Sequence, residues 1–160
     1  MSILEKIMAK FPSSSDAILT ILSLDAELVS ELNSVRGLSV ILPTNGGLSK
    51  SLSYCSKKCL EGENFVNLKR IFRHHVIPGI VSMGGGYRSL EGDVILFNPL
   101  GFINDKFPIK KTVDFEGKRL FFIDFAIWPK SINFCCREER EYLYASESRL
   151  EREFGGLVYL

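Results

Sequence analysis

The sequence predicts a single α+β domain whose helical first half precedes a second half rich in strands. Three observations support this prediction. Apolar residues recur at helical spacing as far as His74, and short strand-like runs follow from Val76 onward. A short apolar run at Leu38–Leu42 also predicts a buried strand early in the chain, and this strand has to join the later strands in one sheet. The two halves therefore share a core and are not separate domains.

Composition narrows the class of protein. A chain of 160 residues is long enough for one domain with its own core, and 46% hydrophobic and 24% charged residues are typical of globular proteins. A net charge of +1 argues against a dedicated nucleic-acid binder, because binding to phosphates requires a basic excess. No apolar run approaches the length of a membrane span.

The first ten residues and the cysteines bear on the cellular compartment. Residues 1–10 include Glu5 and lack both the apolar core and the small-residue cleavage site of a signal peptide, so no export signal is expected in them. Cys55 and Cys59 have the spacing of one helical face, and the adjacent Cys135 and Cys136 are a poor disulfide pair. No disulfide framework is predicted.

The residues before the strand at Leu38–Leu42 are predicted to form three helices. Ser2 and Glu5 have the spacing of a capping box at the start of a short first helix. Asp16 is expected to cap a second helix and Asp25 a third, and Gly37 is expected to end the third.

The segment Leu38–Leu48 organises the rest of the chain. Its apolar start predicts a buried strand that Pro43 ends, because proline cannot donate a hydrogen bond to a neighbouring strand. Thr44 and Asn45 carry oxygens suited to capping the next helix, which the following two glycines are expected to delay or fray. A loop is predicted at residues 60–64 and then an amphipathic helix that ends near His74.

The second half is predicted to form mostly antiparallel strands. Gly84–Gly86 is expected to be a flexible loop, and Phe115–Lys118 a hairpin turn between the last two strands. After Val76, the strand-like runs are Tyr87–Leu90, Asp93–Asn98, Ile109–Phe115 and Arg119–Ile127.

Three of these segments resemble, in order and spacing, the signatures of the fasciclin-like (FAS1) domain family. Leu38–Leu48 resembles the strand that ends in a Pro-Thr-Asn step into a helix, Ile71–Gly79 the central His-Val-Val-x-Gly segment, and Leu120–Pro129 the closing strand with Ile-Asp and Pro. The resemblance covers residues 13–134. It implies that the N-terminal helices pack against a mostly antiparallel β-sheet wedge, in a domain of residues 1–134.

The resemblance also implies a function. FAS1 domains are non-catalytic modules of cell adhesion or of surface and matrix recognition, mostly extracellular or attached to the cell surface, so a protein or surface-polymer partner is expected and no cofactor. In the family, the residue that matches His75 belongs to a Tyr-His pair beside a proposed adhesion surface, and here His74 stands at the Tyr position. The expected partner surface consists of Thr44, Asn45, Arg73, His74, His75 and Pro78.

A metal site and a hydrolase site are the two chemical alternatives to this interpretation. Adjacent histidines such as His74 and His75 rarely share one metal ion, and Cys55 and Cys59 lack a partner pair, so no metal site is predicted. A hydrolase that uses His75, Asp124 and a serine of residues 49–53 is the least favoured function, because no nucleophile elbow is present. The resemblance instead implies that Asp124 is a structural carboxylate held by backbone donors near the first signature.

The last 26 residues form a separate prediction. Residues 135–160 lie beyond the family pattern, and Arg137–Glu153 is expected to be a charged helix packed on or beside the domain. This extension, together with the missing export signal, supports the alternative of a cytoplasmic regulatory or assembly protein that docks, or forms a homo-oligomer, through its C-terminal segment.

Overall fold

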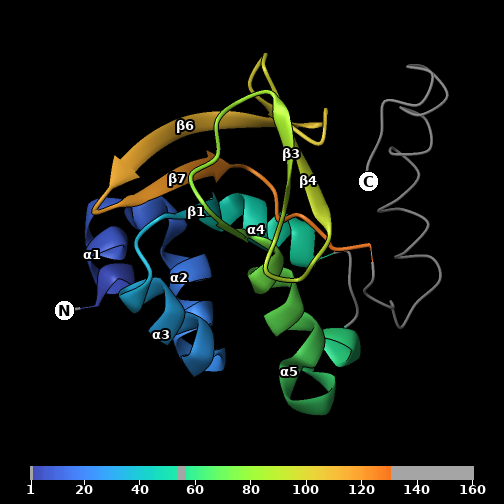
Figure 1. The fold of residues 1–160 in the computed structure, drawn as a ribbon. Coiled ribbons are helices and arrows are strands. Elements are labelled where there is room, and N and C mark those ends of the chain that lie inside the picture. Colours follow the sequence, from blue (N-terminus) through green and yellow to red (C-terminus); the bar gives the residue numbers. More distant parts are fainter. Residues whose placement is uncertain (1, 54–56, 131–160) are drawn as a thin grey trace, which may run out of the picture.

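The computed structural model describes residues 2–53 and 57–130, with the backbone alone for residues 57–64. This part of the chain is a mixed α+β domain, as predicted (Figure 1). The helices are α1 (Ile3–Lys10), the 3-10 turn η1 (Pro12–Ser14), α2 (Ser15–Leu24), α3 (Ala26–Ser34), α4 (Asn45–Leu52) and α5 (Lys57–His74). The strands are β1 (Leu38–Pro43), β2 (Val76–Pro78), β3 (Gly85–Arg88), β4 (Val94–Asn98), β5 (Phe102–Ile103), β6 (Phe107–Phe115) and β7 (Lys118–Ile123).

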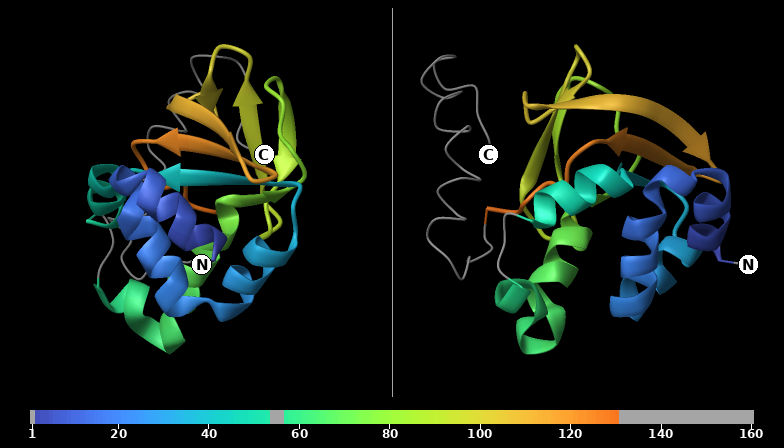
Figure 2. Two further views of the ribbon diagram at one scale, coloured as in Figure 1. Left: turned by 90° about the vertical axis from the view of Figure 1, so that its left-hand side faces the viewer. Right: turned by 180° about the vertical axis from the view of Figure 1, so that it is seen from behind.

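The strands form one seven-stranded sheet in the order β2-β1-β7-β6-β5-β4-β3. β1 runs parallel to β7, and the other neighbouring pairs are antiparallel. The early strand therefore lies between β2 and the last strand, which confirms that the two halves share one sheet. The sheet is strongly bent, so that β3 and β4 stand across the end of the β1–β7 region (Figures 1 and 2).

Alternate residues of β1 and β7 point to opposite faces of the sheet and into two cores. Val40 and Phe122 face the helices, where they pack with residues of α1, α2 and α3. Ile41 and Phe121 face the inside of the bend, where Phe121 and Phe97 of β4 have ring centroids 5.0 Å apart. All six residues of β1 are buried, as its apolar sequence predicts.

Several predicted local signals are confirmed. Ser2 Oγ accepts a hydrogen bond from the Glu5 N–H at 3.2 Å, and Asp25 caps α3 by accepting from the Leu28 N–H at 3.1 Å. The hairpin turn between β6 and β7 has positive φ at Glu116 (47°) and Gly117 (83°), as a tight turn of this type requires. These signals depend on neighbours within a few residues, which is why the sequence alone predicts them.

Other boundaries were predicted wrongly at the helix ends. Asp16 does not cap α2, because it lies in the first turn of that helix and its own N–H is capped by Asn45. Gly37 does not end α3, which stops at Ser34. The residues predicted as a loop at 60–64 belong to α5, although Phe65 has a positive φ of 60°, which no regular helix contains.

Two glycine-rich segments also differ from prediction. α4 begins at Asn45 without delay, despite Gly46 and Gly47. Gly85 and Gly86 are not a flexible loop but belong to β3, where Gly86 pairs with Leu96 of β4. The side chains of Val94 and Leu96, both in β4, lie over Gly86, at 3.1 and 3.3 Å from the position that a Cβ atom would take, so β4 fills the space beside this glycine.

Some predictions lie outside the described residues. These are the C-terminal helix at Arg137–Glu153, the whole segment 135–160 with Cys135 and Cys136, and Cys55. None of the helices described has both the length and the apolar character needed to cross a membrane.

Candidate functional site

The three signature-like segments meet where β1 and β7 end side by side. Because the two strands are parallel, with Pro43 opposite Ile123, their carboxyl ends lie at the same edge. The Thr44 N–H donates to the Ile123 carbonyl oxygen at 2.9 Å and extends this pairing by one residue. The first and third segments are therefore in direct contact.

Thr44 joins the helix cap to Asp124. Its Oγ1 accepts from the Gly47 N–H at 3.1 Å, which caps α4, and donates to Asp124 Oδ1 at 3.0 Å. Asp124 Oδ2 lies 3.1 Å from Lys110 Nζ, and the Asp124 side chain is 53% exposed. The hydrogen bond to Lys110, reinforced by that to Thr44, lowers the pKa of Asp124. The expectation of backbone donors around Asp124 is thus wrong: both partners are side chains, and the carboxylate stands at the surface.

Gly47 allows α4 to begin directly against the end of β7. A Cβ atom at this position would lie 2.3 Å from the carbonyl carbon of Asp124 and 2.7 Å from the Phe125 nitrogen. One turn later, Ser51 Oγ accepts from the Ala126 N–H at 2.8 Å and donates to the Gly47 carbonyl oxygen at 2.7 Å. The edge where the two parallel strands end is therefore closed by backbone contact.

Asn45 connects the same edge to the N-terminal helices. Its Oδ1 accepts from the Asp16 N–H at 2.9 Å and so caps α2, while its Nδ2 donates to the Pro12 carbonyl oxygen at 3.2 Å. Sequence reasoning assigned Asn45 to the cap of its own helix and to a partner surface. In the structure its amide holds a segment about thirty residues earlier, and this non-local use left no signal in the sequence.

His75 is a buried connector at the junction of α5 and β2. It is 1% exposed, and its Nε2 accepts from the Ile127 N–H at 2.9 Å. Nδ1 therefore carries the proton and donates to the Ile71 carbonyl oxygen at 2.6 Å. Burial lowers the pKa of His75 to about 4, against a smaller opposing effect of the bond to Ile71.

His74 is buried as well, on the other side of the same junction. It is 2% exposed, and its Nδ1 shares a hydrogen bond of 2.8 Å with Ser89 Oγ. Burial, with a contribution from neighbouring His75, lowers the pKa of His74 to about 3. The prediction that these two histidines belong to an exposed partner surface is therefore wrong, because neither side chain reaches the surface.

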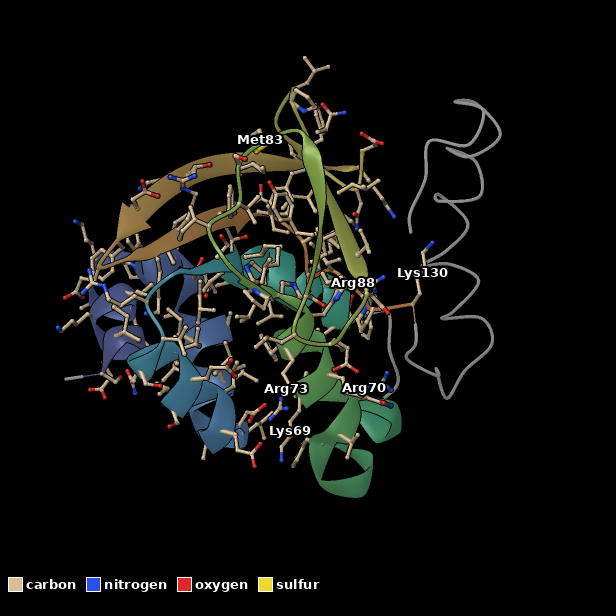
Figure 3. All side chains as sticks on the ribbon, in the orientation of Figure 1. Lys69, Arg70, Arg73, Met83, Arg88 and Lys130 are labelled. Carbon is tan, nitrogen blue, oxygen red and sulfur yellow. The ribbon has the colours of Figure 1, made fainter. Side chains whose placement is uncertain are left out.

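Arg73 joins α5 to the start of α3. Its Nε and Nη2 donate to Asp25 Oδ2 and Oδ1 at 2.7 and 2.9 Å, and Nη2 also approaches Glu27 at 3.4 Å. Asp25 is 4% exposed, and the hydrogen bond from Arg73 lowers the pKa of its carboxyl despite burial. Arg73 and Lys69 lie on the side of α5 that faces α3, whereas Arg70 lies on the other side and pairs with Glu91 (Figure 3). The sequence signal for Asp25 was its cap, and its pairing with Arg73 was not predicted.

Pro78, on the edge strand β2, differs from the other predicted residues because it is exposed. Exposed apolar side chains follow it in the loop before β3, with Ile80 44% and Met83 39% exposed (Figure 3). Gly84, next to Met83, donates its N–H to the Phe97 carbonyl oxygen and lies beside Pro99, so this loop adjoins the β4–β5 turn. Leu100 in that turn is 83% exposed. We call Pro78, Ile80, Met83 and Leu100 the apolar rim.

The predicted hydrolase residues are not assembled for catalysis. Asp124 binds Thr44 and Lys110, whereas His75 binds Ile71 and Ile127, so the two do not form a relay. Ser51 Oγ is held by the backbone of Gly47 and Ala126. Among the side chains that the structure describes, those of residues 2–53 and 65–130, no group of three or more His, Cys, Asp or Glu is placed to hold a metal ion.

Comparison with known proteins leaves the family open. No protein-family model matches the sequence, and no curated protein is significantly similar to it.

Proposed function

We propose that this chain is a FAS1-like, non-catalytic interaction module of the cell-adhesion or surface and matrix recognition type, and that its partner is a protein or surface polymer. The observation that carries the proposal is the use of the polar residues in the three signature-like segments. Thr44, Asn45 and His75 each have their hydrogen-bonding atoms occupied by other parts of the same chain. Residues whose polar atoms are bonded within the chain stabilise the fold and are not available to bind a substrate.

The arrangement of the motifs supports the family part of the proposal. The first and third segments adjoin through Thr44 and Asp124, and the second reaches the third through His75 and Ile127. Three segments that are far apart in the sequence thus converge on one junction, in the order in which the family has them. The bent sheet with helices on one face is compatible with the wedge that the resemblance implies (Figure 2).

The partner surface is better assigned to the apolar rim than to the histidines. Pro78 is the exposed residue of the partner surface predicted from the sequence. Ile80 and Met83 in the loop before β3, and Leu100 in the β4–β5 turn, are exposed as well. Exposed apolar side chains carried by loops on a rigid sheet are typical of protein-binding surfaces. A protein partner is therefore favoured over a highly charged polymer.

The test is a binding assay with the rim changed and a matched control. The purified chain is immobilised, and binding of collagen, heparin and a second copy of the chain is measured by interferometry, together with attachment of cultured cells. We expect binding to at least one of these probes, and a loss of about tenfold or more in the double variant Ile80→Ser with Met83→Ser. The control is Leu19→Ser on α2, where a side chain 49% exposed is removed from a different face.

Failure would take one of two forms. Absence of binding to all probes by the folded wild-type chain would contradict the proposed function. Equal losses in the rim variant and in Leu19→Ser, with circular dichroism spectra unchanged, would contradict the location of the surface.

A further inference from the structure

A polar pocket lies at the end of the molecule where the start of α1, the end of α3 and the β6–β7 hairpin meet. α1 and the hairpin occupy the left of Figure 1, and this end faces the viewer in the left panel of Figure 2. The pocket has a volume of about 580 Å³. Its charged lining residues are Lys6, Arg36, Glu116 and Lys118, so three cations stand against one carboxylate.

Lys118 is the unusual residue of this pocket. As the first residue of β7 it shares the helix-facing row with Leu120 and Phe122, which are core residues. Lys118 is 4% exposed and has no hydrogen bond or ion pair with any other residue in the described part of the chain. Burial lowers the pKa of Lys118, nearby Arg36 lowers it further, and Glu116 opposes the shift. Its Nζ is not a fully buried atom, so the ammonium group reaches the pocket, where it can meet a partner from outside the chain.

Arg36 adds a second cation without a partner of its own. Its side chain lies against the hairpin turn, where a Cβ atom at Gly117 would be 2.9 Å from Arg36 Nε. No hydrogen bond or ion pair of the Arg36 guanidinium occurs within the described residues. Glu116 does not neutralise it, because that carboxylate is already paired with Lys6 at 3.1 Å. The pocket therefore has an excess of two positive charges, on Arg36 and Lys118.

The uncharged lining is also suited to an acceptor ligand. Asn33 Oδ1 accepts from the Ile3 N–H at 2.9 Å, so the group that Asn33 has left to offer is its Nδ2 donor. Ser2 and Ile3 bring the N-terminal end of α1 into the same wall, and a helix N-terminus favours negative charge. Of these groups, the Asn33 Nδ2 donor is the one suited to an anion, because the Ser2 hydroxyl already donates to Glu5 Oε1 at 3.1 Å.

We infer that this pocket binds a small molecule carrying a tetrahedral oxyanion, a phosphate or sulfate ester, with Lys118 and Arg36 as the counter-charges. A guanidinium and an ammonium together match two charged oxygens of such a group. The volume exceeds what a free ion needs and falls in the range of small-molecule sites, so the ester-linked part of the ligand has room beside the anion. This inference does not depend on the proposed adhesion function or on the family resemblance.

The experiment is a titration followed by amide NMR spectra and by the melting temperature. Inorganic phosphate, inorganic sulfate and glucose 6-phosphate are added at constant ionic strength, with chloride and glucose as controls. We expect saturable shifts at residues of the α1 start and the β6–β7 turn and a rise in melting temperature, because a ligand of the folded state stabilises it. Comparison of phosphate, sulfate and the sugar ester shows which source of the oxyanion the pocket prefers.

Variants separate this pocket from general surface charge. Lys118→Met is expected to fold with equal or higher stability without ligand, since it keeps a buried aliphatic side chain of similar length and removes an unpaired charge, and to bind the anions about tenfold more weakly or worse. Arg36→Gln should weaken binding in the same direction. Lys50→Met removes the same charge from exposed α4 and should change nothing. Absence of saturable binding by the wild-type chain, or undiminished binding by Lys118→Met, would overturn the inference.

Discussion

The close approach of α4 to the end of β7 makes a sharp prediction at two adjacent glycines. Gly47→Ala places a methyl group 2.3 Å from the Asp124 carbonyl carbon and 2.5 Å from its oxygen. These are backbone atoms at the end of a central strand, which cannot rotate away as a side chain could. Gly46→Ala adds the same methyl group in the same helical turn, where nothing lies within 4 Å. The pair therefore differs in the contact alone.

The magnitudes follow from this geometry. Gly47→Ala forces α4 away from β7, which costs about 1–3 kcal/mol as overpacking, and weakening of the buried bond from the Ala126 N–H to Ser51 adds about 1 kcal/mol. The expected loss of unfolding free energy is about 2–4 kcal/mol, or roughly 5–15 °C in melting temperature for a domain of this size. Gly46→Ala should instead gain about 0.5–1 kcal/mol, because alanine is the better helix former.

The assay is urea denaturation of the wild type and both variants, followed by far-UV circular dichroism. Equal slopes with separated midpoints would show that stability has changed and not the extent of unfolding. If Gly47→Ala proved as stable as Gly46→Ala, the first and third signature-like segments would not be in contact as described. The reasoning about their shared junction would then fail.

Two further predictions concern buried ionisable groups. Arg73→Met leaves the Asp25 carboxylate, which is 4% exposed, without its ion partner and should lower the free energy of unfolding by about 3–5 kcal/mol. Asp25→Asn should lower it less, because the Arg73 side chain is 35% exposed and can be hydrated. Urea midpoints that rank the two variants in the opposite order would contradict this. Burial holds the pKa of His74 at about 3 and of His75 at about 4, so the unfolded chain takes up protons below pH 6.5 that the folded chain does not. The contribution of the two histidines to the free energy of unfolding should be fully present above pH 6.5. It should fall toward pH 4 by up to about 1.4 kcal/mol per pH unit for each histidine. His74→Asn should remove about half of this slope, as measured by urea midpoints between pH 6.5 and 4.5.

What the sequence predicted well was local or strongly periodic. The Ser2 and Asp25 caps, the buried β1 and the turn at Glu116 and Gly117 depend on neighbouring residues, whose spacing is visible in the chain. The α+β class followed from the order of helical and strand-like periods. Recognition that Leu38–Leu42 joins the later strands was the long-range step, and it held because so apolar a strand requires cover on both faces.

What the sequence could not predict depended on partners far along the chain. Asn45 carried the signal of a cap, but the helix it caps is α2, which begins thirty residues earlier, at Ser15. Gly85 and Gly86 carried the signal of a loop, but both pair with β4 in a strand, where side chains of β4 lie over Gly86. Lys118 is a different case, because the sequence placed it in the hairpin turn, whereas the structure makes it the first residue of β7, in one row with Leu120 and Phe122.

The parallel pairing of β1 and β7 places the polar residues Thr44 and Asp124 side by side at the carboxyl ends of the two strands. In open sheets, ligands bind in a crevice beyond the carboxyl ends of parallel strands. Here α4 starts directly in that place, and Gly47 lets its backbone reach Asp124 and Phe125 without an intervening side chain. The space beyond the two parallel strand ends is thereby filled by α4. We propose binding at two other places with opposite chemistries, the apolar rim for a protein surface and the cationic pocket around Lys118 for a small anion.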